Sequence, residues 1–225
     1  LLPMILAIGN YHATSNTLAN QALAKGLFAT LLPMIPLGLV ILPFTISFGR
    51  DMADGVTTRF VLFGYRMAKQ LVAKFVSVAI LVSLVTVVYC LVLYQVLPLP
   101  SMSMLSLANV FASTMILTAA LYLLSFAIAQ VFKGFNMIQG VAMVCYFGIA
   151  FLTGSMGTFQ LPRTLEKAIE WIPFAAIRET LKMHWGSNTV TDMQTEWFKL
   201  IVFLLITLFL FGLAEFYRRL KIHAV

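Results

Sequence analysis

Apolar and polar stretches alternate along the chain in the pattern of a polytopic membrane protein. Crossing a bilayer takes about 20 apolar residues in a helix. Runs of this kind cover residues 26–48, 75–97, 107–132, 137–157 and 197–217. Residues 1–9 are apolar but too few to cross, so we interpret them as the outer end of a span that begins outside this sequence. The pattern predicts an all-α protein with six transmembrane helices, the first truncated at its start, in a single transmembrane domain over residues 1–225.

The polar stretches between these runs carry the rest of the pattern. Residues 10–25 are rich in Asn, Ser and Thr and are predicted to form a loop. Residues 49–74 are basic. If residues 56–74 are helical, four polar side chains lie within about 100° of one another: Arg59, Arg66, Lys69 and Gln70. An apolar stripe then follows on another face, formed by Val56, Phe60, Phe63, Met67 and Leu71. This segment is either an interfacial helix on anionic headgroups or a surface for a soluble partner.

The second long polar segment, residues 158–196, precedes the last span. Apolar residues recur in it at spacings of three and four: Leu161, Leu165, Ile169, Ile172 and Ala176. This spacing predicts one or two amphipathic helices at the outer surface, which Pro173 would break or offset. A lid that merely covers the helix bundle fits the same pattern.

Composition agrees with a membrane protein: 61% of the residues are hydrophobic and 10% are charged, against about 25% charged in soluble domains. The formal net charge is +7, which raises the alternative of a nucleic-acid binder. Alternate loops, however, place nine basic and three acidic residues on one side, and six basic and five acidic residues on the other. The positive-inside rule explains this asymmetry without a nucleic acid. It places residues 49–74 and the C-terminus in the cytoplasm.

The sequence offers little catalytic chemistry. No charged residue lies near the middle of a predicted span, which argues against an ion-coupled transporter. The chain has no G-x-S-x-G, H-E-x-x-H or G-x-x-x-x-G-K-[ST] motif, so it contains no predicted catalytic residues and no nucleotide site of its own. Its three histidines are too scattered to predict a metal site, and Cys90 and Cys145 are interpreted as buried apolar residues.

The order and spacing of these features resemble the membrane permeases of type 2 ATP-binding-cassette (ABC-2) exporters. The resemblance covers nearly the whole chain, with a basic loop after the second span and a helical outer insert before the sixth. In the loop it is carried by Arg50, Asp51, Asp54, Gly55, Thr57, Arg59 and Lys74. In the outer insert it is carried by Gly154, Leu161, Pro162, Pro173 and Glu179. Asp51 and Asp54 stand where the family often has Glu, and Gly64 stands where Pro is common.

The resemblance implies a mechanism and roles for these residues. Two permease chains pair, as a homodimer or heterodimer, in what we expect to be a bacterial plasma membrane, and each binds an ATPase subunit that holds ATP and Mg. ATPase coupling falls on Arg50, Asp51, Asp54, Gly55 and Arg59, next to a cytoplasmic amphipathic helix with Arg66, Lys69 and Lys74. The resemblance assigns the outer insert or gate to Leu161, Pro162, Pro173 and Glu179. ATP-driven closure tilts the second and fifth spans and moves cargo outward.

The sequence allows more than one interpretation of the cargo pathway and of the function class. We expect an apolar pathway lined by Phe44, Phe48, Phe147 and Phe151, suited to a hydrophobic or amphipathic cargo such as a drug, a peptide or a lipid-linked molecule. The alternative is that these four side chains face lipid. An ATP-independent channel or lipid scramblase, with the basic loop as a lipid-binding surface, is a second function class. A membrane enzyme that uses Glu179 or His184 of the outer insert is a third.

Overall fold

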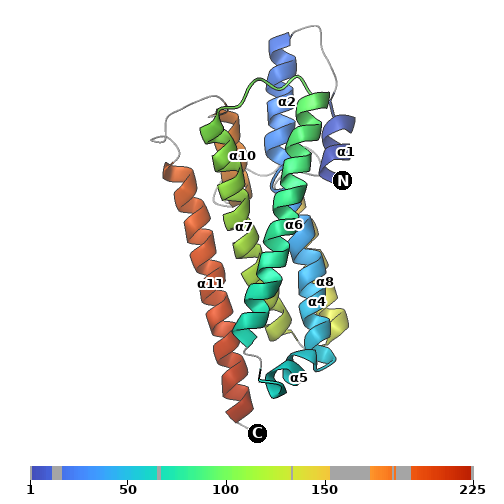
Figure 1. The fold of residues 1–225 in the computed structure, drawn as a ribbon, viewed down its shortest axis with the longest axis vertical. Coiled ribbons are helices and arrows are strands. Elements are labelled where there is room, and N and C mark those ends of the chain that lie inside the picture. The colour runs from blue at the N-terminus through green and yellow to red at the C-terminus, as the bar shows by residue number, and fades with distance from the viewer. Residues whose placement is uncertain are drawn as a thin grey trace.

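In the computed structural model, the described residues are 2–11, 17–64, 67–132, 134–152, 173–183, 185 and 194–223, and their regular secondary structure is entirely helical (Figure 1). The elements, in chain order, are α1 (Leu2–Gly9), α2 (Thr17–Leu31), α3 (Met34–Pro36), the π-helical η1 (Leu37–Ile41), α4 (Leu42–Ala53), α5 (Val56–Leu62), α6 (Met67–Val96), α7 (Met104–Val131), α8 (Phe135–Leu152), α10 (Pro173–Met183) and α11 (Gln194–His223).

Several of these helices are of membrane-spanning length. Four helical stretches of the described chain are long and apolar enough to cross a bilayer: Thr17–Ala53, Ala68–Val96, Met104–Val131 and Trp197–Phe216. A shorter apolar helix covers Phe135–Phe151. The chain is therefore an integral membrane protein, helical throughout the regular structure of its described residues. Short α5 and the C-terminal end of α11 lie at one end of the bundle (Figure 1), which we call the basic end after its Arg and Lys residues.

The helix that contains the second predicted span is longer at its start than predicted. Residues 17–25, predicted as part of a loop, form the first turns of α2. Their Ala, Leu, Gln and Lys residues are strong helix formers, although this stretch is more polar than the run that follows it. Ala24 and Phe28 are fully buried, and α2 packs against α10 and α1. Packing of this face explains why the polar stretch is helical rather than a loop.

Prolines interrupt the same helix without ending it. A turn at Leu32–Pro33 is followed by α3, the π-helical η1 and α4, with Pro43 as the second residue of α4. Proline lacks the N–H that an α-helix needs, so these positions disturb the regular ladder. All residues from Leu31 to Leu37 are buried in the bundle. Irregular backbone is tolerated at membrane depth where protein covers it.

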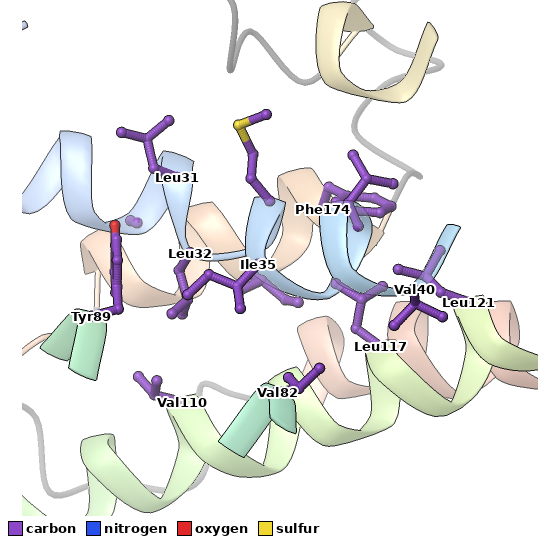
Figure 2. Close-up of a cluster of buried hydrophobic side chains, with 14 of the residues drawn as sticks. Leu31, Leu32, Ile35, Val40, Val82, Tyr89, Val110, Leu117, Leu121 and Phe174 are labelled. Atoms are coloured by element: carbon purple, nitrogen blue, oxygen red, sulfur yellow. The ribbon is translucent and has the colours of Figure 1, made fainter. Parts of the chain in front are cut away.

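Helix α7 is central to the packing, with contacts to α11, α4, η1, α6, α8 and α10. Leu117 and Leu121 of α7 lie close to Val40 of η1, and Val82 of α6 belongs to the same buried cluster (Figure 2). Buried hydroxyls on α7 bond to carbonyls of their own helix, for example Thr118 Oγ1 to the Thr114 oxygen at 2.7 Å. Because these hydroxyls are satisfied locally, α7 can carry them through an apolar core.

Candidate functional site

The predicted coupling segment forms a turn–helix–turn at the basic end. Helix α4 ends at Ala53, and the Asp54 N–H donates to the Arg50 oxygen at 2.8 Å. Gly55 and Gly64 then have left-handed backbone angles, with φ of +66° and +83°, and they flank α5. Residues with side chains rarely adopt these angles, so glycine permits both reversals. A single helix over residues 56–74 is therefore wrong: α5 ends at Leu62, and α6 begins at Met67.

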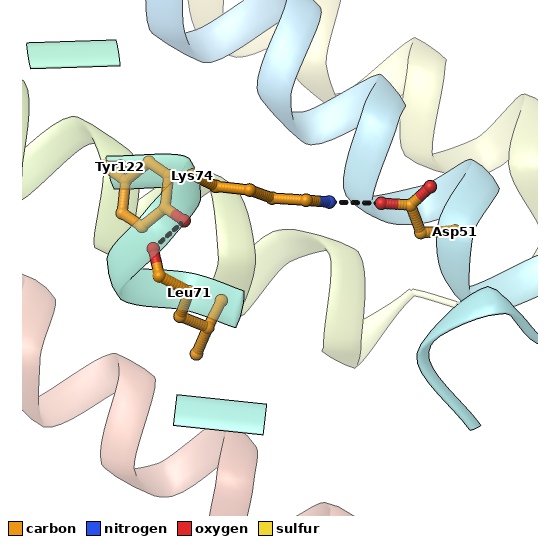
Figure 3. Close-up of polar contacts among 4 residues, drawn as sticks. All are labelled: Asp51, Leu71, Lys74 and Tyr122. Carbon is orange, nitrogen blue, oxygen red and sulfur yellow. Dashed lines mark hydrogen bonds and ion pairs between the residues drawn. The ribbon is translucent and has the colours of Figure 1, made fainter. Parts of the chain in front are cut away.

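The two ends of this segment are joined by an ion pair. Lys74 Nζ on α6 donates to Asp51 Oδ2 on α4 (Figure 3). The same ammonium group lies 4.8 Å from the ring centroid of Phe48, one turn before Asp51. The Lys74 and Asp51 side chains are 35% and 29% exposed, so water screens the pair only in part. Among the predicted coupling residues, Asp51 thus pairs with a residue of another helix.

An aromatic cluster connects this ion pair to the core. Phe48 is 3% exposed, and its ring centroid lies 5.4 Å from that of Tyr122 and 5.1 Å from that of Phe126, both on α7. Tyr122 Oη donates to the Leu71 oxygen on α6 at 2.8 Å (Figure 3). Edge-to-face rings and a hydrogen bond thus fix the ends of α4 and α6 against α7. The segment therefore rests on a packed base.

The other coupling residues point to solvent. Arg50 Nε lies 3.6 Å from Asp54 Oδ2, with side chains 75% and 60% exposed. Arg59 on α5 is exposed, and the last residues of α5 and its turn add apolar area, with Leu62 81% and Phe63 79% exposed. We call Arg50, Asp54, Arg59, Leu62 and Phe63 the tip surface. Lys69 is exposed on the first turn of α6, and Arg66 lies outside the described residues. Charges of both signs beside apolar side chains suit a protein surface of complementary charge.

One polar contact at the basic end was not predicted. Gln130 Nε2 on α7 donates to Glu215 Oε2 on α11 at 3.1 Å. It links the ends of two helices whose residues are far apart in sequence. The polarity of Gln130 near the end of an apolar run is the only sequence signal for it, and that signal names no partner.

At the opposite end, part of the predicted outer insert is a short helix. Pro173 is buried and is the first residue of α10, a position that suits its fixed φ and missing N–H. Glu179 accepts a hydrogen bond from Arg178 Nε at 2.9 Å. Leu161 and Pro162 lie outside the described residues. Trp185 is 2% exposed and donates from Nε1 to the Pro100 oxygen at 3.0 Å. Helix α10 therefore begins at Pro173, and the chain just after it is anchored to the turn between α6 and α7.

The predicted pathway residues lie in two different environments. Phe44 and Phe48 lie on α4 with ring centroids 6.1 Å apart, and both contact Tyr122 inside the bundle. Phe147 and Phe151 lie on α8 and are 51% and 42% exposed. Phe44 and Phe48 thus lie inside the bundle and Phe147 and Phe151 on its surface, and a pathway lined by all four stays a prediction.

The described residues show no cluster of three or more His, Cys, Asp or Glu side chains that could hold a metal ion. The described residues of the tip surface offer charge pairing and apolar contact. Comparison with known proteins assigns no family: no family model, no curated protein and no solved structure matches the chain.

Proposed function

We propose that this chain is the transmembrane subunit of an ATP-driven exporter of the ABC-2 type. It pairs with a second permease chain and binds a separate ATPase subunit, which holds ATP and Mg. Hydrolysis in that subunit drives a hydrophobic or amphipathic cargo outward. The proposal rests on the tip surface, where charged and apolar side chains are exposed at the basic end on a packed base.

The construction of the tip supports a role in force transfer. A movement applied to α5 reaches α4 through the short turn at Gly55, and it reaches α6 through the ion pair of Asp51 and Lys74. Because Phe48 packs on α7, the displacement would extend into the bundle instead of being absorbed by a loose loop. An anchored tip of this kind suits a partner that changes conformation during its reaction cycle.

In this proposal the energy source is a separate subunit. The sequence has no phosphate-binding loop and no charged residue near the middle of a predicted span that could couple transport to an ion. An ATPase subunit bound at the tip surface supplies what the chain lacks. A channel or scramblase needs no such partner, and this difference separates the two function classes.

The test is affinity purification of the tagged chain from native membranes, followed by identification of co-purifying subunits and an ATPase assay. We expect an ATP-binding-cassette subunit to co-purify in an amount equal to that of the permease. This co-purification should be lost in the Arg50→Glu and Asp54→Lys variants. Both side chains are mostly exposed, so neither change should unfold the bundle. Lys25→Glu, on α2 at the far end of the bundle, is the matched charge control.

A double variant separates two explanations of a loss. Arg50→Glu with Asp54→Lys restores an i,i+4 ion pair on α4 but exchanges the charges that a partner meets. If the partner recognises the charges of residues 50 and 54, the double variant should also fail to bind the ATPase subunit. A permease that purifies without an ATPase from membranes containing all cellular subunits would favour the channel or scramblase class.

A further inference from the structure

A lateral groove lies between α6, α7 and α11 toward the basic end. Its volume is about 300 Å³, and its walls include Leu71, Val72 and Phe75 of α6, Ala119 of α7 and Phe211 of α11. Val72 is 62% exposed at the surface of α6. The groove is thus open to the side of the bundle, which is the side that faces the bilayer.

The chemistry of the groove fits a hydrocarbon chain. Tyr122 carries the only hydroxyl among the lining side chains, and its hydrogen is donated to the Leu71 oxygen. Pockets for drug-sized molecules usually combine apolar walls with several placed polar groups. This groove has apolar walls without such a set, so a chain of methylene groups matches it better than a functionalised molecule does.

The depth of the groove brings it close to lipid headgroups. Helix α6 has 30 residues, or about 45 Å at 1.5 Å per residue, whereas the hydrocarbon core of a bilayer is about 30 Å thick. The lining begins at Ala68, the second residue of α6. One wall of the groove therefore reaches the boundary of the hydrocarbon at the basic end.

Charge at this boundary favours an anion. Lys69 is exposed directly after Ala68, and Glu215, the nearest acidic residue along α11, already accepts from Gln130. Beyond Phe211, α11 continues to His223 and carries three more basic residues on its last turns: Arg218, Arg219 and Lys221. Clustered Lys and Arg residues at a membrane surface attract anionic headgroups.

We infer that the groove binds an acyl chain of an anionic phospholipid from the leaflet at the basic end, with the lipid phosphate near Lys69. The site is independent of the proposed transport function, because it requires no ATPase and no cargo. A zwitterionic lipid, or a second copy of this chain covering the groove, is the competing occupant.

Photolabelling of the full chain in vesicles tests this site. The probes are phosphatidylglycerol and phosphatidylcholine, each with a diazirine in the middle of one acyl chain, followed by mapping of labelled peptides. We expect labels on the groove walls of α6, α7 and α11, with phosphatidylglycerol preferred roughly fivefold. Lys69→Gln should remove most of that preference, whereas Lys25→Gln at the opposite end should not. Equal labelling by both lipids would overturn the headgroup assignment.

Filling the groove tests the acyl-chain assignment. Ala119→Phe on the α7 wall and Val72→Phe at the exposed mouth should each abolish labelling of the groove walls. Val72 is largely exposed, so its variant should fold even if the α7 variant does not. Val88→Phe, an exposed position on α6 away from the groove, is the matched control and should leave labelling unchanged. Labelling that persists in both groove variants would overturn the site. Labelling of the groove only in the monomeric chain would also overturn it, because a second copy would then cover the groove.

Discussion

Lys74, the eighth residue of α6, pairs with Asp51 near the end of α4, and its ammonium group also lies over the ring of Phe48. This contact closes the base of the segment that contains α5. It joins two residues that the sequence placed in different groups, one in a coupling tip and one in an amphipathic helix. The pairing makes Asp51 a structural residue of the tip base and leaves Arg50, Asp54 and Arg59 to face outward.

Reversing either charge of this pair should loosen the tip. We expect Asp51→Lys or Lys74→Asp to cost about 1–2 kcal/mol, between the values for exposed and buried ion pairs. Thermal unfolding in detergent, together with hydrogen exchange of residues 49–64, measures the effect. The double reversal, Asp51→Lys with Lys74→Asp, should recover a large part of the loss. A double variant no more stable than either single variant would show that the pair is not coupled.

Gly49 should be intolerant of a larger residue. A Cβ at this position would lie 2.9 Å from Ile138 Cδ1 and 3.0 Å from Ile138 Cγ2 on α8. We expect Gly49→Val to destabilise the bundle by about 1–3 kcal/mol through overpacking, measured by thermal unfolding. Gly140→Ala and Gly148→Ala on α8 are the controls, because a Cβ at either position meets nothing within 4 Å.

The overpacking should be relieved by its partner. Ile138→Ala in the Gly49→Val background should restore part of the lost stability, although Ile138→Ala alone should be destabilising. If the stability losses of Ile138→Ala and Gly49→Val are simply additive, the contact between α4 and α8 is not the cause of the Gly49→Val destabilisation.

Removing the hydroxyl of Tyr122 should have a small effect, whereas removing its ring should have a large one. Tyr122→Phe loses the hydrogen bond to the Leu71 oxygen, which we expect to cost roughly 0.5–1 kcal/mol. Tyr122→Ala also loses ring contacts with Phe44, Phe48 and Phe75, which raises the cost to about 3–5 kcal/mol. Melting temperatures of the two variants compare the contribution of the hydroxyl group with that of the ring. Similar losses for both would mean that the hydroxyl, and not the aromatic packing, joins α6 to α7.

The two ends of the bundle should lie on opposite sides of the membrane, with the tip in the cytoplasm. Leu62→Cys and Met104→Cys place single thiols at exposed positions near the two ends, in a background of Cys90→Ala and Cys145→Ala. A membrane-impermeant maleimide should label the Met104 variant in intact cells, and the Leu62 variant only after permeabilisation. The reverse pattern would invert the orientation that the basic residues predict.

The sequence predicted long apolar helices well where hydropathy alone decides the structure. The runs at 75–97, 107–132 and 197–217 fall on α6, α7 and α11. The start of α2 was missed because its residues are polar, and their helix is held by packing against α10 and α1. The separation of α5 from α6 depends on the backbone angle of Gly64, which the amphipathic pattern across residues 56–74 does not reveal.

The sequence alone did not predict how the candidate site residues are arranged. Arg50, Asp54 and Arg59 are exposed at the tip, as a partner surface requires. The pairing of Asp51 with Lys74 could not be read from the sequence, because 23 positions separate the two residues and several acids and bases could pair. The links from Gln130 to Glu215 and from Trp185 to Pro100 span 85 positions each. Contacts between residues this far apart in the sequence depend on how the helices pack, and the periodicity of apolar residues does not specify that packing.

The most direct test of the central claim is photocrosslinking from the tip in living cells. Leu62→p-benzoylphenylalanine places the probe on α5, and Met104→p-benzoylphenylalanine places the same probe at the opposite end on a side chain of similar exposure. We predict that the α5 probe crosslinks an ATP-binding-cassette ATPase and that the control probe does not. An α5 probe that crosslinks only lipid, in cells where the chain is folded and inserted, would contradict the exporter account.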